Sequence, residues 1–437
     1  MKRLTFYGLC LTVFLIVLAG CGPNGQEGRE TKINTVSENT SVKKDDKKIK
    51  LVYWGQDSGD TTKKELVEQF NKTHPNIEVQ LEEIPWNGQH DKLIASLAAN
   101  SGPDIFDGKM IWLPEFLGLN VVEDLTPYLD KWHGKNDMIK GVLDIVTTKD
   151  GKVYGLPYDL VSQILYYRKD IFQQAGLKPP SSYEELLETA KKLTVDSNKD
   201  GKIDQYGFGL RGGRFGHETW ATFVLSNMSE PAFFDKNNKV SFTNADAVQA
   251  NQLWLDMYSK YKVVPDSSIT DSFNEIVGNL QSGVTAMTIG NIKMAGRLLQ
   301  ILGKDKLGAV PLPPGKNGKR INFVGDWESY LNKDIEPQKK EAGFTFIAWL
   351  SEKEQIKQWS KGLRSVPISN SLKDDPEYAN DEFQQAAMLS LDNAAIIPVH
   401  PKMGEWTENI WPQATQKALL GQYTSQQMME QLSKPFQ

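Results

Sequence analysis

Cysteine is the scarcest informative residue in this chain. Its 437 residues include only two cysteines, Cys10 and Cys21, and both lie near the N-terminus. The chain that follows Cys21 therefore has no thiol that could form a disulfide, attack a substrate or bind a metal. Its stability has to come from packing, and thiol catalysis is excluded from it.

Histidine and phosphate-binding motifs are also sparse or missing. The five histidines are scattered along the chain without an HxxxH spacing, which argues against a zinc site. The sequence contains no GxxxxGK[ST] loop of the kind that cradles phosphates. We therefore expect neither a zinc enzyme nor a P-loop nucleotidase.

The chain also lacks an excess of positive charge. Its net charge is −5 and its pI is about 5.7, so no electrostatic attraction to nucleic acid is expected. A hydrophobic content of 39% and an aromatic content of 10% are typical of a globular protein. At this length the chain is expected to form two domains or lobes, each with its own core.

No apolar run is long enough for an ordinary membrane span. The longest, residues 4–18, has about 15 residues, whereas a spanning helix needs about 20. Lys2 and Arg3 precede it and small residues follow it, which is the layout of a secretory leader. We expect residues 1–20 to be a cleaved signal peptide.

The end of this leader resembles a bacterial lipobox, the signal at which cleavage leaves a lipid-modified cysteine as the new first residue. The matching residues are Leu18-Ala19-Gly20-Cys21. The resemblance implies that Cys21 carries acyl chains, and two or more chains anchor a protein stably to a membrane. Residues 21–48 are polar and charged, so we expect a flexible tether with a reach of roughly 30 Å.

From residue 49 onward, strand and helix patterns alternate. Residues 49–54 alternate as a strand, residues 61–74 have helical spacing, and residues 77–81 alternate again, which predicts a βαβ unit. Residues 162–168 and 321–327 are predicted to be strands that cross between lobes. We expect an α/β fold in which residues 49–158 and 287–325 form lobe 1, and residues 159–286 and 326–437 form lobe 2.

Four stretches in this order carry a family resemblance. They are FNKTHPNI at 70–77, GPDI at 102–105, GLPY at 155–158 followed by LYYRKDIF at 165–172, and QSGVTAM at 281–287. With them the chain resembles the extracellular solute-binding proteins of carbohydrate uptake, the maltose-binding-protein-like, lipid-anchored receptors of ABC importers. Two departures fall where ligand contacts are expected, at residues 290–293 and 325–328.

The resemblance implies a two-lobed periplasmic-binding-protein fold of type II, the Venus-flytrap fold, with crossing hinge strands. A saccharide would bind between the lobes, and hinge closure would be recognised by an ABC permease in the membrane. The implied protein is a monomer that binds without turnover, needs no cofactor and resides on the outer face of the cytoplasmic membrane. Three alternatives stay open: a receptor for a non-sugar solute, a surface carbohydrate hydrolase and a polymer-binding adhesin.

Sugar sites combine flat aromatic faces with polar groups that bind the hydroxyl edges. Aromatic candidates at strand ends or in loops are Trp54, Trp112, Tyr158, Trp220, Trp327 and Trp406. Polar candidates are Asp57, Asp107, Asp159, Asn291, Asp326, Glu328 and Arg364. Core packing is the alternative for each aromatic residue, and solvated surface is the alternative for each polar one. Asp326 and Glu328 are two apart, which also leaves a glycosidase pair open.

One loop matches the first half of a calcium-binding loop. Oxygen-bearing side chains occupy its positions 1, 3, 5 and 9, namely Asp196, Asn198, Asp200 and Asp204. Position 12 is Gly207 instead of the usual glutamate. Structural calcium is therefore the one cofactor that the sequence leaves open, against the alternative of an Asx-rich turn.

Overall fold

The computed structural model describes residues 48–437, apart from residues 58–60, 87, 140–141, 236–238, 373, 392–393 and 397–399. The side chains of residues 145, 326 and 394–396 are not described either. The predicted signal peptide, Cys21 and the tether up to residue 47 therefore lie outside the described residues. The chain from Lys47 onward forms one compact unit.

The first of two sheets contains the N-terminal strands. Its strands are β1 (Ile49–Gln56), β2 (Ile77–Ile84), β3 (Ile105–Gly108), β4 (Gly155–Val161), β9 (Asn322–Leu331) and β10 (Ala394–Ile396). The order is β10-β9-β3-β1-β2, and β4 also pairs with β9. β1 is parallel to both β2 and β3, which confirms the predicted βαβ unit.

The second sheet has four strands in the order β6-β7-β5-β8. They are β5 (Gln163–Arg168), β6 (Tyr206–Gly209), β7 (Thr285–Asn291) and β8 (Leu307–Val310). Here the structure differs from the expected division, which assigned residues 287–325 to lobe 1. β5 pairs with both β7 and β8, so the chain returns to the first sheet only at β9.

Helices on the first sheet come from both ends of the chain. They are α1 (Thr62–Thr73), α2 (Gln89–Ala98), η1 (Met110–Trp112), α3 (Leu113–Leu119), α4 (Thr126–Leu129), η2 (His133–Asp137), η3 (Leu143–Val146), α11 (Pro337–Leu350) and α12 (Lys353–Leu363). α11 packs on β1 and α12 packs on α1 and β4, although residues 326–437 were expected in lobe 2. The apolar faces of α11 and α12 pack against strands of the first sheet.

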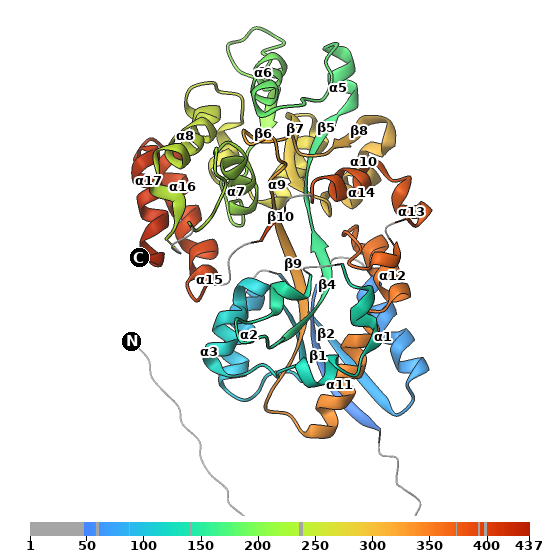
Figure 1. Cartoon of the computed structure of the whole chain (residues 1–437). Coiled ribbons are helices and arrows are strands. Elements are labelled where there is room, and N and C mark those ends of the chain that lie inside the picture. Colours follow the sequence, from blue (N-terminus) through green and yellow to red (C-terminus); the bar gives the residue numbers. More distant parts are fainter. Residues whose placement is uncertain are drawn as a thin grey trace, which may run out of the picture. The chain divides into compact units, whose positions relative to one another are not determined.

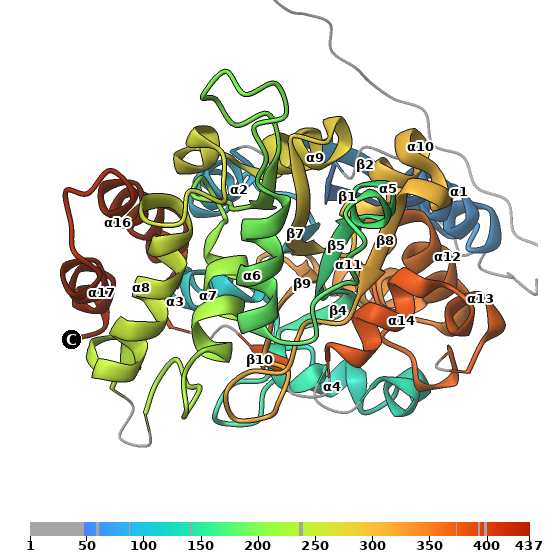
Figure 2. The ribbon, with the colours of Figure 1, turned by 90° about the horizontal axis from the view of Figure 1, so that it is seen from above.

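The remaining helices pack around the second sheet. They are α5 (Lys169–Gln174), α6 (Tyr183–Leu193), α7 (His217–Ser226), η4 (Ser241–Thr243), α8 (Ala245–Ser259), η5 (Asp266–Ile269), α9 (Phe273–Ser282), α10 (Met294–Lys306), α13 (Pro376–Ala379), α14 (Glu382–Leu389), α15 (Met403–Glu405), η7 (Trp406–Ile410), α16 (Trp411–Leu419), α17 (Ser425–Ser433) and η8 (Lys434–Phe436). η6 (Asn370–Leu372) is an exception, because it contacts α12. α8, α16 and α17 contact one another outside α7 (Figure 2).

Two crossings join the sheets in the way the sequence predicts. Ser162 is the only residue between β4 and β5, which run nearly end to end (Figure 1). β9 returns beside β4, and its first residue holds the crossing together. The Asn322 side chain donates to Ser162 Oγ at 2.7 Å and accepts from the Gln163 backbone N–H at 3.0 Å.

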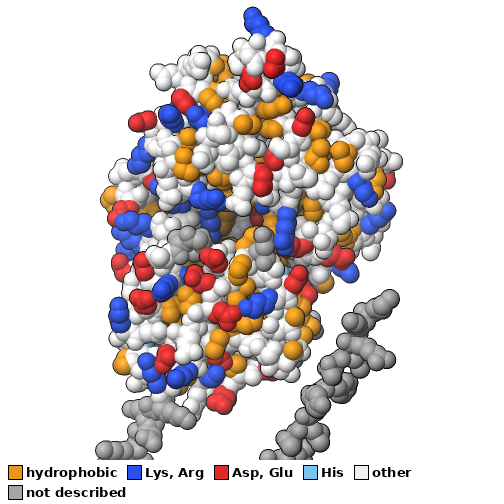
Figure 3. Space-filling model, turned by 180° about the vertical axis from the view of Figure 1, so that it is seen from behind, with side chains coloured by type: hydrophobic (Ala, Val, Ile, Leu, Met, Phe, Trp, Pro, Cys, Tyr) orange, Lys and Arg blue, Asp and Glu red, His pale blue; other side chains and the backbone are white. Residues whose placement is uncertain are grey.

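On the face of the molecule drawn in Figure 3, the described residues form no patch in which all charges have one sign. Basic and acidic side chains are interspersed there (Figure 3). Among the described residues, no helix combines the length and the apolar composition that crossing a bilayer requires.

Candidate ligand-binding site

Five polar or aromatic residues follow the carboxyl ends of parallel strands. Asp57, Trp86 and Lys109 follow β1, β2 and β3, and Arg211 follows β6, while Asn291 ends β7. The carboxyl ends of parallel strands are where open α/β sheets bind ligands. Contacts between residues of the two sheets show that these edges meet, and we call the region between them the crevice.

Three tryptophans from the first sheet and one phenylalanine from the second form the crevice cluster, defined as Trp86, Trp112, Trp327 and Phe215. Ring centroids lie 5.3 Å apart for Trp86 and Trp327, and 6.1 Å apart for Trp112 and Trp327. Phe215 reaches Trp86 from the other side at 4.7 Å. Aromatic rings thus cover the crevice from both sides.

A lysine lies against this cluster and pairs with a glutamate across the crevice. Lys109 Nζ lies 4.9 Å from the ring centroid of Trp86 and 3.4 Å from Glu218 Oε1. Burial alone would raise the pKa of Glu218, but the charges of Lys109 and Arg211 outweigh it and lower that pKa. Glu218 is therefore ionised at neutral pH, and the pair holds the two edges together.

Two small cavities lie beside Glu218, at the carboxyl ends of β6 and β7. Each has a volume of about 10 Å³, and both are lined by Arg211, Thr219 and Ile289. Such a volume is close to that of one water, so a larger ligand requires the crevice to open. Gln163 and Asn291 line the second cavity as well.

Arg211 is the charged residue of these cavities. Burial lowers the pKa of Arg211 to about 10, opposed by the charges of Glu218 and Glu275, so the guanidinium stays protonated at neutral pH. Its Nε is buried and has no hydrogen-bond partner among the described residues, and the same is true of Asn291 Oδ1. A donor and an acceptor are thus both left to a ligand.

Besides Asp57, which follows β1 at its edge, the structure places four predicted residues in or beside the crevice. Trp112 and Trp327 belong to the crevice cluster, and Asn291 lines a cavity. Asp159, on the crossing strand β4, forms an ion pair with Lys293, which lies between β7 and α10. Their predicted contacts with a ligand stay predictions.

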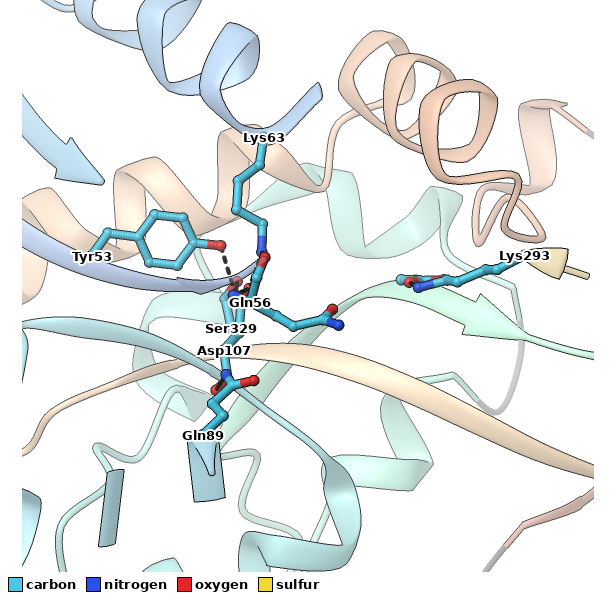
Figure 4. Close-up of polar contacts among 8 residues, drawn as sticks. Tyr53, Gln56, Lys63, Gln89, Asp107, Lys293 and Ser329 are labelled. Carbon is cyan, nitrogen blue, oxygen red and sulfur yellow. Dashed lines mark hydrogen bonds and ion pairs between the residues drawn. The ribbon is translucent and has the colours of Figure 1, made fainter. Parts of the chain in front are cut away.

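Asp107 is enclosed by protein groups. It accepts hydrogen bonds from the Tyr53 hydroxyl at 2.6 Å and the Gln56 backbone N–H at 2.9 Å, and it forms an ion pair with Lys63. Figure 4 shows these side chains converging on Asp107, with Lys293 set apart from them. Both charges are almost fully buried, so the pair ties α1 to β3 rather than facing the crevice.

The structure does not bring Trp54, Trp220 and Trp406 into the crevice cluster. Trp54 packs under Lys92, whose Nζ lies 4.2 Å from its ring centroid. Trp220 and Trp406 are buried, with their centroids 6.1 Å apart. Their indole N–H groups donate to Asn251 at 2.8 Å and to the Leu432 carbonyl at 2.9 Å. These are the contacts of core packing, the alternative that the sequence left open.

The remaining predicted residues have structural contacts of their own. Tyr158 stacks on Trp359 at 4.7 Å, and Arg364 pairs with Asp381 at 3.0 Å. Glu328 is fully buried on β9, while Asp57 is exposed. The side chain of Asp326 lies outside the described residues, so the predicted carboxylate pair is not described as a pair.

Sequence reasoning missed Trp86, Lys109, Arg211, Phe215 and Glu218. A usable signal existed for three of them, because Trp86 and Arg211 follow β2 and β6 by two residues and Lys109 follows β3 directly. Phe215 lies between β6 and α7, where residues 210–216 have no regular pattern that fixes side-chain direction, and Glu218 lies in the first turn of α7.

The predicted calcium loop is held by its own hydrogen bonds. Asp196 accepts from the Gly201 backbone N–H at 2.9 Å, and Asp204 accepts from the Ser197 N–H at 2.8 Å. Among the described residues, no group of three or more histidines and acidic residues is placed to hold a metal ion. Calcium binding stays a prediction, and the observed bonds are those of an Asx-rich turn.

Comparisons with known proteins agree with this geometry. Residues 54–357 match the model of the family described as bacterial extracellular solute-binding protein. The arabinooligosaccharide-binding protein of Bacillus subtilis is 26% identical over 400 residues, which cover 88% of this chain and 86% of that protein. The galactooligosaccharide-binding protein of the same organism is 25% identical and covers 93% of this chain and 90% of its own.

Solved structures share the fold. Maltose-bound MalE3 of T. maritima has a TM-score of 0.76 and 25% identity, covering 89% of this chain and 99% of its own. An ABC substrate-binding protein from Listeria monocytogenes in complex with cycloalternan has a TM-score of 0.78 and 20% identity, covering 89% and 98%. The predicted two-lobed, maltose-binding-protein-like fold is thereby confirmed.

Proposed function

The chain belongs to the bacterial extracellular solute-binding proteins, and from this premise we propose that it captures a sugar or oligosaccharide in the crevice and delivers it to an ABC permease. The crevice cluster is the observation that carries this proposal. Trp86 is partly buried, and Trp112, Trp327 and Phe215 are buried in this closed arrangement. Opening of the crevice would expose flat faces of Trp86, Trp112 and Trp327 beside the first sheet and of Phe215 beside the second. Stacking on such faces suits the apolar CH surface of a sugar ring, and the names of the relatives point to the same ligand class.

Polar groups at the crevice would bind the hydroxyl groups of a sugar. Lys109, Glu218, Gln163 and Asn291 meet at the crevice from both sheets. A ligand that binds them all stabilises the closed arrangement by its differential affinity for it. Closure is then the signal that a permease recognises, and rotation at the Ser162 crossing is the motion that provides it.

We extend the proposal to the location of the protein. Lipid on Cys21 would hold it at the outer face of the cytoplasmic membrane, with residues 21–48 as a tether to a monomeric body. The family and its relatives are binding proteins, which supports binding without turnover. Mass spectrometry of the chain purified from membranes tests the anchor: a mature N-terminus at Cys21 with acyl chains is expected, and an unmodified Cys21 would contradict it.

Calorimetry on the full chain in detergent tests the ligand class. The panel contains maltose, raffinose, an arabinooligosaccharide and a galactooligosaccharide, with mannitol and amino acids as non-sugar solutes. Binding of at least one saccharide is expected, without release of new reducing ends on prolonged incubation. Release of reducing ends would establish a hydrolase, and binding confined to amino acids would establish a non-sugar receptor.

A further inference from the structure

The cavities beside Glu218 contain one charge and little room. Among the described residues that line them, Arg211 is the only charged one, and the others are apolar or neutral. Arg211 as a whole is only partly exposed, and a guanidinium that is shielded from part of the surrounding water binds an acceptor favourably. Nevertheless, Arg211 Nε is buried and has no partner among the described residues.

The nearest carboxylates have other partners. Glu218 lies 3.4 Å from Lys109 and accepts from the Gln163 side chain at 3.4 Å. Glu275 accepts from the backbone N–H of Ser272 at 3.0 Å in the capping box that begins α9. Both act on Arg211 through space, but neither supplies the planar pair of oxygens that a guanidinium binds best.

Resting on the proposed function, we infer that the saccharide bound in the crevice carries a carboxylate, as a uronic acid does, and that Arg211 binds it. Asn291 adds a second requirement, because its Oδ1 lines the same cavity and is also buried without a donor. A uronic acid has a carboxylate next to a ring hydroxyl. It therefore offers an acceptor to Arg211 and a donor to Asn291 at adjacent positions.

Charge distinguishes the carboxylate from a phosphate. A sugar phosphate carries a charge between −1.5 and about −2 at neutral pH and calls for a second cation. Lys109 and Lys293, two further cations in or beside the crevice, are paired with Glu218 and Asp159. One uncommitted guanidinium therefore matches one carboxylate, and a neutral sugar would leave the charge of Arg211 unpaired.

Matched ligand pairs test this inference by calorimetry on the full chain in detergent. The pairs are galactose and galacturonate, glucose and glucuronate, and α-1,4-galactobiose and α-1,4-digalacturonate, with galactose 6-phosphate as the phosphate arm. The acidic member of the bound pair is expected to bind about ten- to hundred-fold more tightly than the neutral one. The preference should shrink as salt is added.

Variants assign the preference to Arg211. R211Q should abolish the acidic preference, because it weakens binding of the acidic member far more than binding of the neutral one, and R211K should retain part of the preference. R297Q is the matched control, since Arg297 is exposed on α10 and donates to Asn274. It should leave the preference unchanged, and the melting temperature of each variant shows that it is folded.

The outcomes separate this inference from the proposed function. Equal or tighter binding of neutral sugars, tighter binding of the sugar phosphate, or an equal loss for both members in R211Q overturns the inference but leaves a sugar receptor. Failure of every saccharide in both panels overturns the proposed function, and the inference falls with it.

Discussion

Two tryptophan clusters in this chain look alike in composition and differ in position. The crevice cluster joins residues of both sheets, and Lys109 lies against it. A second group, which we call the core cluster, consists of Trp220, Trp406, Trp411 and Phe242 and belongs to helices around the second sheet alone. Aromatic content therefore does not mark a ligand site. The rings proposed above as ligand contacts are instead those that meet between the two sheets.

We expect the largest effect from a substitution in the core cluster, where it should lower the stability of the protein. Replacing Trp406 with alanine should lower the free energy of unfolding by about 3–5 kcal/mol, because the ring is fully buried among other rings. Urea denaturation measures the loss. Sugar affinity of the folded fraction should change little, and a selective loss of affinity without a loss of stability would erase the distinction between the two clusters.

The next effect is in the crevice cluster. Trp86 is only partly buried, so W86A should weaken saccharide binding by about 2 kcal/mol or more while the melting temperature without ligand falls little. Calorimetry and a thermal melt measure the two quantities. W132A is a matched control, since Trp132 is also partly buried but packs on Phe344 at 6.5 Å. Equal affinities for W86A and W132A would contradict the assignment.

His217 connects the two clusters, with its ring 6.0 Å from Phe215 and 5.9 Å from Trp406. Burial lowers its pKa from 6.5 to about 3, so the unfolded chain binds more protons than the folded one between these values. Stability is then fully present above pH 6.5 and decreases as pH falls. Between pH 7 and pH 5 this residue should cost about 2 kcal/mol of unfolding free energy.

The variant H217F should remove that share of the pH dependence, because phenylalanine fits the aromatic surroundings and does not titrate. Urea denaturation of both proteins at pH 7 and pH 5 gives the comparison. Equal losses in the wild type and in H217F would show that His217 does not carry the difference.

The smallest effect concerns the ion pair that crosses the crevice. E218Q removes the charge that faces Lys109 and should weaken closure of the unliganded protein by about 1–2 kcal/mol. Small-angle scattering should then report a larger radius of gyration without ligand. The lowered pKa of Glu218 means that this contribution is present above about pH 4.5 and is lost at lower pH. An unchanged radius would show that the pair does not hold the edges together.

Local patterns were enough for the fold. The strand at residues 49–54, the helix stopped before Pro75 and the crossing after residue 161 are all where the sequence predicts them. Sheet membership was harder, because β7 and β8 are apolar strands that would suit either sheet. Only their pairing with β5, which is distant in the sequence, places them in the second sheet, and no local sequence pattern predicts that pairing.

The site was only partly predictable, for a different physical reason. Trp112 and Trp327 were named because they follow or lie on strands, and both reach the crevice. Trp406 was named for its place in a loop-like stretch, but that stretch forms the π-helical turn η7 and buries the ring. Whether a side chain faces the crevice or the core depends on one turn of backbone, which composition does not reveal.

The single residue between β4 and β5 has a mechanical consequence. Only Ser162 separates β4 from β5, and Asn322 at the start of the second crossing is hydrogen-bonded to it, so the two sheets cannot move apart along these strands. A longer ligand therefore requires a wider angle between the two sheets and not a greater distance between them. Angle-sensitive probes placed on α1 and α6 would then report the size of a guest as well as its presence.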